Sequence, residues 1–176
     1  MTTISYLNVS SASQLSADIT AIDLASVSAT NTNYVITLAA GATLRESADI
    51  DAINLAGSDT LTINGQGAKL NGAGAYRGLF AYSGATTIEN LTIENCVAKG
   101  GAGGSTGSRG AGGGGAGLGG GLFVANNSAG GAAPANVTLD DVIFKSDSGV
   151  GGAGGARSGS GVSGGGGGLG LSLIHI

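Results

Sequence analysis

A segment that occurs twice at a constant spacing constrains the fold of this chain more than any other feature. Residues 87–104 align without a gap with residues 138–155, so that Thr87 corresponds to Thr138 at an offset of 51. The same offset places residues 113–119 on residues 164–170, within the glycine-rich tracts. Self-similarity at a fixed period of this size indicates stacked structural units, each of which buries an apolar face on its neighbour.

Two shorter similarities divide this unit further. Residues 60–65 (Thr-Leu-Thr-Ile-Asn-Gly) resemble residues 90–95 (Asn-Leu-Thr-Ile-Glu-Asn) at a spacing of 30. We therefore expect a basic coil of about 30 residues, into which glycine-rich excursions are inserted at one corner. The tripeptide Gly-Leu-Phe begins an apolar strand at residues 78–80 and another at 121–123. Each coil should thus contain at least two strands.

Alternation of apolar and polar residues separates the two faces of the repeated strand. Leu91 and Ile93 should face the core, because side chains two residues apart share a face of a strand. The equivalent residues of the second copy are Val142 and Phe144. The outward positions include Glu94 and Lys145, which would form a surface ion pair worth on the order of 0.2–1 kcal/mol if the coils stack in parallel.

The N-terminal region predicts a helical cap. Ser11 to Gln14 match a Ser-x-x-Gln capping box, and Leu15, Ile19 and Ile22 follow on one face of a short amphipathic helix. We expect residues 1–33 to cover the strand edges and the apolar end of the stack. β-branched residues become frequent from Tyr34, and residues 34–170 are expected to form the stacked coils.

The glycine-rich segments at about 97–120 and 148–170 allow two interpretations. Glycine with alanine and serine is typical of a flexible linker, because such a segment cannot offset its ordering entropy by burial. Their recurrence in register, between well-formed strands, favours order instead. Glycine backbones can also pack closely as extended left-handed helices.

The last six residues, 171–176 (Leu-Ser-Leu-Ile-His-Ile), interrupt the repeat abruptly. They are also what the codons CTG TCT CTT ATA CAC ATC encode, and that string resembles the transposon adapter used in sequencing libraries. We therefore expect these residues to be adapter-derived, with further coils in the natural protein. His175, the only histidine, would then not belong to it.

Composition excludes several classes of partner. The chain of 176 residues has a net charge of −4 and only 10% charged residues, which gives no electrostatic reason to expect nucleic acid or an anionic membrane as a partner. Aromatic residues are scarce, so stacking platforms for sugars or bases are poorly supplied. No apolar run reaches the length of a membrane span, and the first residues do not resemble a secretory signal.

No candidate catalytic, cofactor-binding or metal-binding residue emerges from the sequence. Cys96 aligns with Asp147 in the second copy, which favours a turn or rim position and an unpaired thiol without chemistry. Asp49 and Asp51 could serve glycoside hydrolysis or hold calcium, but charges on a solvated face are the usual explanation. Residues 57–61 match half of a calcium-binding nonapeptide, although a β-turn is the simpler interpretation. The pair at residues 140–141 likewise indicates a turn, and neither glycine tract contains a phosphate-loop motif.

The capped N-terminus, the Leu-Thr-Ile strands, the glycine-rich insertions and Gly120-Gly121-Leu122-Phe123-Val124-Ala125-Asn126 together resemble bacterial right-handed parallel β-helix proteins. These include autotransporter-like adhesin passengers and the repeats of polymorphic outer membrane proteins. The resemblance covers roughly residues 34–170. It implies an all-β fold, a right-handed parallel β-helix like the pectate-lyase solenoid, in a secreted or surface-attached protein.

The sequence therefore predicts a fragment of an exported, non-catalytic passenger with an adhesive or structural role at a cell surface. Its expected partners are a host or neighbouring cell surface, or a polysaccharide. One alternative is a carbohydrate-active enzyme, a polysaccharide lyase or hydrolase, which would require clustered acidic groups with Arg or Lys. A second is an ice- or crystal-binding surface, for which Thr62 and Thr92 would begin a rank that Ile143 interrupts.

Overall fold

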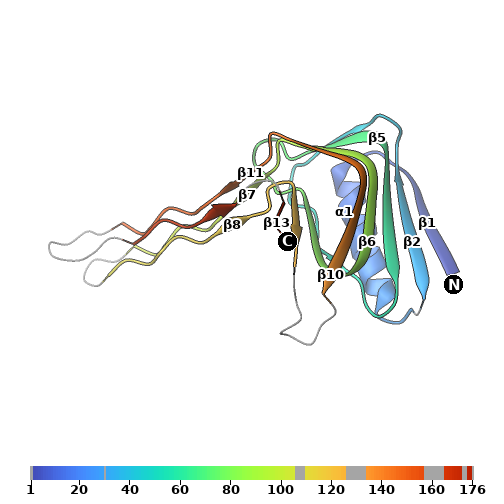
Figure 1. The fold of residues 1–176 in the computed structure, drawn as a ribbon, viewed down its shortest axis with the longest axis horizontal. Coiled ribbons are helices and arrows are strands. Elements are labelled where there is room, and N and C mark those ends of the chain that lie inside the picture. The colour runs from blue at the N-terminus through green and yellow to red at the C-terminus, as the bar shows by residue number, and fades with distance from the viewer. Residues whose placement is uncertain are drawn as a thin grey trace.

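The computed structural model describes residues 2–29, 31–105, 110–125, 134–156, 165–171 and 174–175. These residues form one helix and a series of parallel strands (Figure 1). The elements are β1 (Thr2–Val9), α1 (Ala12–Ser26), β2 (Thr32–Leu38), β3 (Thr43–Arg45), β4 (Ile53–Asn54), β5 (Thr60–Asn71), β6 (Leu79–Glu94), β7 (Val97–Lys99), β8 (Gly117–Leu118), β9 (Leu122–Val124), β10 (Ala135–Lys145), β11 (Ser148–Val150), β12 (Gly170–Leu171) and β13 (Ile174–His175).

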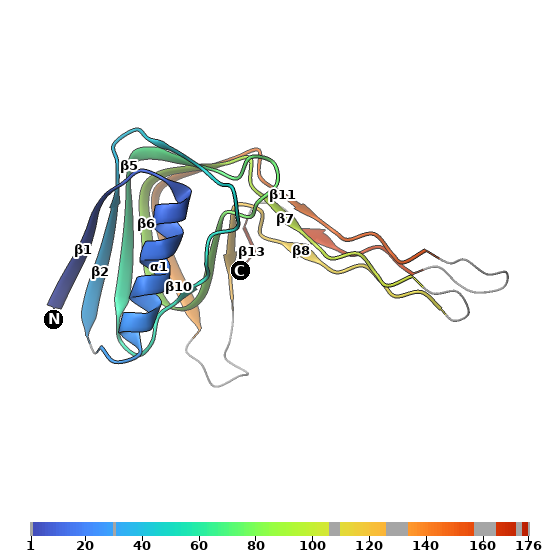
Figure 2. The same ribbon diagram turned by 180° about the vertical axis from the view of Figure 1, so that it is seen from behind.

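The main sheet has nine strands in the order β1-β2-β5-β6-β9-β13, with β10 and β4 also paired to β6 and β3 paired to β5. Two smaller parallel sheets join β11 to β7 and β12 to β8. In Figure 1, β1, β2, β5, β6 and β10 lie side by side as one curved layer. Figure 2 shows α1 in front of this layer, on its inner side.

The prediction of an all-β, right-handed parallel β-helix is wrong. The described strands form a parallel sheet with a fifteen-residue helix packed against it, and they show no closure into a solenoid. The repeat correctly indicates parallel strands stacked at a fixed spacing. A period alone, however, does not specify what covers the inner face of such a sheet, and here α1 contributes to that cover.

The N-terminal helix forms as predicted. The Ser11 hydroxyl caps it by accepting a hydrogen bond from the Gln14 backbone N–H at 3.2 Å, and the Gln14 side chain accepts one from the Ser10 N–H at 3.3 Å. Leu15, Ile19 and Ile22 are fully buried. The helix therefore joins the same apolar core as the strands.

Apolar side chains form continuous columns through the stacked strands. One column runs through Ile36, Ile63 and Ile88, which occupy matching register positions on β2, β5 and β6 and are fully buried. The predicted core residues Leu91 and Ile93 are buried too, and their partners Val142 and Phe144 pack against the same core. Glu94 and Lys145 are register partners, as expected.

The offset of 51 is the pairing register of the structure, because β10 pairs with β6 so that Thr138 lies beside Thr87, and β11 pairs with β7 at the same offset. The offset of 30 is wrong for the first coil. Leu61 pairs with Thr86 rather than with Leu91. The two similar Leu-Thr-Ile strings therefore do not pair with each other. Residues 61–63 lie before the bend of β5, whereas residues 91–93 lie after the bend of β6.

Each long strand bends at a residue with left-handed backbone. These residues are Gln66 in β5 (φ 50°), Asn90 in β6 (φ 52°) and Asp141 in β10 (φ 51°). Asn and Asp tolerate this conformation better than most residues, because their short side chains bond to nearby backbone. The pair at residues 140–141, expected to form a turn, thus lies at the bend of β10.

The described residues of the two glycine-rich segments form an ordered arm that projects from the sheet (Figures 1 and 2). Backbone N–H groups three residues apart bond to a neighbouring segment: those of Gly100 and Gly103 reach Val150 and Ala153 at 2.8 Å, and the pattern continues through Gly112, Gly115, Gly152, Gly155, Gly165 and Gly168. A repeat of three residues is that of the extended left-handed helix. The linker interpretation is therefore wrong for these residues.

Steric contact explains why glycine is needed at these spacings. A Cβ atom added to Gly152 would come within 3.0 Å of the backbone of Gly101, whereas one added to Gly166 would meet no atom within 4 Å. The positions that face a neighbouring segment thus require glycine, and the outward ones do not.

Candidate binding surface

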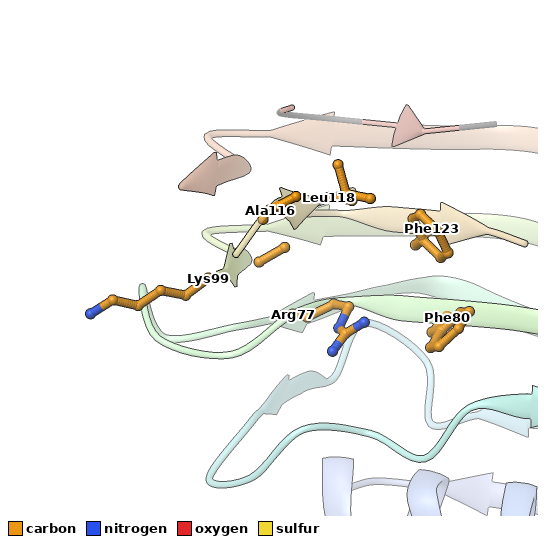
Figure 3. A pocket seen from close by; sticks show the side chains of 8 residues that line it. Arg77, Phe80, Lys99, Ala116, Leu118 and Phe123 are labelled. Atoms are coloured by element: carbon orange, nitrogen blue, oxygen red, sulfur yellow. The ribbon is translucent and has the colours of Figure 1, made fainter. Parts of the chain in front are cut away.

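A hollow of about 220 Å³ lies where β6 and β9 meet the base of the glycine arm (Figure 3). The repeated Gly-Leu-Phe tripeptides place its aromatic side chains, since Leu79 pairs with Leu122 and Phe80 with Phe123. The leucines point into the core and the phenylalanines point outward, as strand alternation requires. The lining residues are Arg77, Phe80, Ala98, Lys99, Ala116, Gly117, Leu118 and Phe123.

Three aromatic rings follow one another along this surface. Phe80 and Phe123 meet edge to face, with ring centroids 5.0 Å apart at 77°, and Phe80 meets Tyr82 in the same way at 6.1 Å and 81°. These distances and angles are those that aromatic pairs favour. The aromatic strip, defined as Phe123, Phe80 and Tyr82, therefore presents rings fixed by one another.

A cation stands beside Phe80, the middle ring of the aromatic strip. The guanidinium carbon of Arg77 lies 5.4 Å from the centroid of the Phe80 ring, within the range of a cation–π interaction. The backbone N–H of Arg77 donates to Asp49 Oδ1 at 3.0 Å, which anchors the start of this segment. Figure 3 shows the Lys99 side chain extending away from the rings, so only its stem lines the hollow.

Carboxylates stand at the Tyr82 end of the strip, in a second hollow of about 440 Å³ that Tyr82 also lines. Asp23 accepts hydrogen bonds from the Asn54 N–H at 3.0 and 3.1 Å. Burial, more than the nearby charge of Asp51, raises the pKa of Asp23 to about 6. Leu24 and Val27 are 71% and 78% exposed beside it. Along β6 the surface thus passes from the Arg77 guanidinium over Phe80 to Tyr82 and two acids, with Phe123 beside Phe80 on β9.

The sequence pattern did not reveal this strip. Aromatic residues are few in the whole chain, and their scarcity therefore gave no reason to expect a stacking platform. The available signal was the outward position of Phe in both Gly-Leu-Phe copies, together with Tyr82 two residues after Phe80. Stacking in register concentrates these few rings on one face.

The acidic residues singled out in the sequence have local structural roles. Asp51 Oδ2 accepts hydrogen bonds from the hydroxyls of Ser16 at 3.0 Å and Thr20 at 2.7 Å, which fastens the loop between β3 and β4 to α1. Asp49 and Asp51 lie in this loop and not on a strand. Arg45 and Lys69 lie on β3 and β5, with Arg45 lining a different hollow.

Residues 57–59 form the expected turn before β5. Asp59 is buried, and its Oδ1 accepts a hydrogen bond of 2.7 Å from the Thr32 N–H at the start of β2. It is a link between strands. The expected threonine rank is also revised, because Thr62 pairs with Thr87 and then Thr138, while Thr92 lies beside Lys69.

Cys96 is fully buried, so its expected place at a rim is wrong. Its N–H donates to Asp147 Oδ1 at 2.8 Å, and its Sγ lies 4.0 Å from Glu46 Oε1. Gly72 makes room, because a Cβ there would meet Cys96 Sγ at 2.9 Å. Burial, followed by the charges of Asp147 and Glu46, raises the pKa of the Cys96 thiol, which keeps it protonated and unreactive.

Among the described residues, no group of three or more His, Cys, Asp or Glu side chains could hold a metal ion. At fifteen residues, α1 is too short to cross a bilayer, and the described part of the chain contains no longer helix. Residues 172–173 and 176 of the expected adapter-derived end lie outside the described residues, while 170–171 and 174–175 form β12 and β13.

Comparison with family models, curated proteins and solved structures gave no match.

Proposed function

We propose that this chain is a non-catalytic, adhesive surface protein that binds an anionic polysaccharide along the aromatic strip. The observation that carries the proposal is Arg77 held over Phe80, with Phe123 beside it, at the mouth of a hollow. The C–H face of a pyranose ring is apolar and packs on an aromatic ring, while a guanidinium binds carboxylate or sulfate through paired hydrogen bonds.

The shape of the surface supports an extended ligand. Phe80 and Tyr82 lie on the same face of β6, and Phe123 continues that face on β9. Phe80 and Phe123 line one hollow and Tyr82 lines the other. A polymer can lie across such a surface and contact several rings at once, and adhesion by many weak contacts suits a repetitive ligand.

Binding of polygalacturonate tests the proposal, with its methyl-esterified form as the neutral counterpart. We expect the intact chain to bind the charged polymer more tightly than the ester. Phe80→Ala should weaken binding to both forms, whereas Arg77→Gln should remove only the preference for the charged form. Arg45→Gln, at an exposed arginine of another hollow, is the matched control. Equal binding by all variants would refute the role of the strip.

One observation favours the alternative of a carbohydrate-active enzyme. Asp23, with its pKa raised to about 6, lies with Asp51 in the hollow that contains Tyr82, and glycoside hydrolysis uses a carboxyl group with a raised pKa. Release of reducing ends from the polymer, abolished by Asp23→Asn, would establish that activity. Binding without release supports the adhesive role.

A further inference from the structure

Among the described residues, β1 and β10 form the two edges of the curved layer, while the short strands β3, β4 and β13 also have a single partner each. β1 pairs only with β2, and β10 pairs only with β6. Each edge strand therefore carries a row of backbone N–H and C=O groups with no partner strand. Figure 1 shows these two strands at opposite sides of the curved layer, running in the same direction.

The core columns reach both edges without being covered. One column contains Ile4, Tyr34, Leu61, Thr86 and Val137, and the next contains Tyr6, Ile36, Ile63, Ile88 and Leu139. The inner members are at most 2% exposed, but Ile4 is 41% exposed and Leu139 is 38% exposed. The same columns are thus completed in the middle of the sheet and left open at its ends.

From Thr2 to Leu7, before the irregularity at Asn8, β1 lacks the features that usually prevent edge pairing. It is eight residues long and contains no charged residue and no proline, and Ile4 and Leu7 are exposed along it. Natural edge strands are commonly protected by lysine, proline, a bulge or an inward charge. A long, uncharged and partly apolar edge is a site for strand addition.

We propose that copies of this chain associate head to tail, with β10 of one copy pairing in parallel with β1 of the next. The register places Val137 beside Ile4 and Leu139 beside Tyr6, so that each apolar column continues into the next copy. Such a contact joins two different surfaces and leaves one of each free, so it forms open-ended filaments.

The positions of the bends fit a second copy as the occupant. With Val137 beside Ile4, Asp141 falls beside Asn8. Both residues have left-handed backbone, with φ of 51° and 60°. Six residues of β10 precede its bend, and they match the six residues of β1 from Thr2 to Leu7. An arbitrary strand would match the columns or the bend only by chance.

Two variants, each blocked at one edge, test this arrangement in the full chain. Ile4→Lys places a charge on the β1 column and Leu139→Lys places one on the β10 column. Because both side chains are partly exposed, the lysine ammonium can reach solvent in the monomer. Leu24→Lys, on the exposed face of α1, is the matched control.

Sedimentation velocity should show the unmodified chain and Leu24→Lys growing in size with concentration. Each blocked variant alone should remain monomeric, and an equimolar mixture of the two should form dimers through the intact edges. A monomeric unmodified chain, or a mixture that stays monomeric, would overturn the proposal. So would assembly by either blocked variant alone, because that would indicate a symmetric contact.

Hydrogen exchange on the unmodified chain gives a second measurement that does not depend on how the variants fold. Amide protection of residues 2–7 and 135–140 should rise together as protein concentration increases. Protection that is independent of concentration at either edge would contradict the pairing.

Discussion

Glu46 should make the stability of this protein fall as the pH rises from acid to mildly alkaline. Its side chain is 2% exposed, and its Oε2 has no hydrogen-bond partner. Burial, followed by the charges of Asp49 and Asp147, raises the pKa of Glu46 from 4.5 to about 8. The folded protein therefore retains a proton on Glu46 that the unfolded chain has already released.

The sign and size of the effect follow from that difference in pKa. Between pH 4.5 and 8 the folded state binds more protons than the unfolded state, so the free energy of unfolding decreases with pH. Stability is fully present below the unfolded pKa and is lost as the pH rises through the folded pKa. One pKa unit corresponds to about 1.36 kcal/mol, which sets a ceiling of about 5 kcal/mol on the loss.

Urea unfolding of the intact chain and of Glu46→Gln, measured at intervals from pH 4 to 9, tests this prediction. Glutamine has nearly the same shape and carries no charge at any pH. The variant should therefore match the intact chain near pH 4.5 and exceed its stability by several kcal/mol near pH 8, up to the ceiling given above. Glu89→Gln, on the outer face of β6, is the matched control. Parallel profiles for Glu46→Gln and the intact chain would refute the reasoning.

Three further outcomes are expected. Gly152→Ala should destabilise the arm by roughly 1–3 kcal/mol, because its Cβ would meet the backbone of Gly101, whereas Gly166→Ala should be nearly neutral; hydrogen exchange of the arm amides measures both. Cys96 should react with a thiol reagent only when the protein unfolds, and rapid labelling of the native chain would contradict its burial. Ser11→Ala should lower the free energy of unfolding by about 1 kcal/mol through loss of the N-cap, as measured by urea unfolding.

The sequence predicts the local elements of this protein better than it predicts whether the sheet closes on itself. The capping box located α1, and the offset of 51 gave the pairing of β6 with β10 residue by residue. A strand repeat reports only which residues stack. Whether the sheet closes on itself depends on contacts far apart in the chain, such as those of Leu15 and Ile19 with the strand core, and these leave no periodic signal.

The residues that sequence reasoning misplaced share a physical cause. Cys96 aligns with an aspartate, which favours an exposed position, yet Cys96 and Asp147 are both buried. Asp147 is tolerated there because it accepts the Cys96 N–H, and Glu46 because its raised pKa leaves it neutral. A polar residue in a sequence therefore indicates solvent only when no neighbouring strand supplies a partner, and that partner becomes visible only once the strands are stacked.

The same stacking explains why the proposed binding strip and the proposed assembly edges are separate surfaces. Among the described residues, register pairing completes the apolar columns that contain Ile4 and Tyr6 within the sheet and leaves them open at β1 and β10. Phe80 and Phe123 belong to an outward column, which stacking leaves accessible along the side of the sheet. Head-to-tail growth would therefore cover the open ends of the core while leaving the aromatic strip exposed. Each added copy would present another strip along the same side, so that assembly would multiply the weak contacts on which adhesion to a polymer depends.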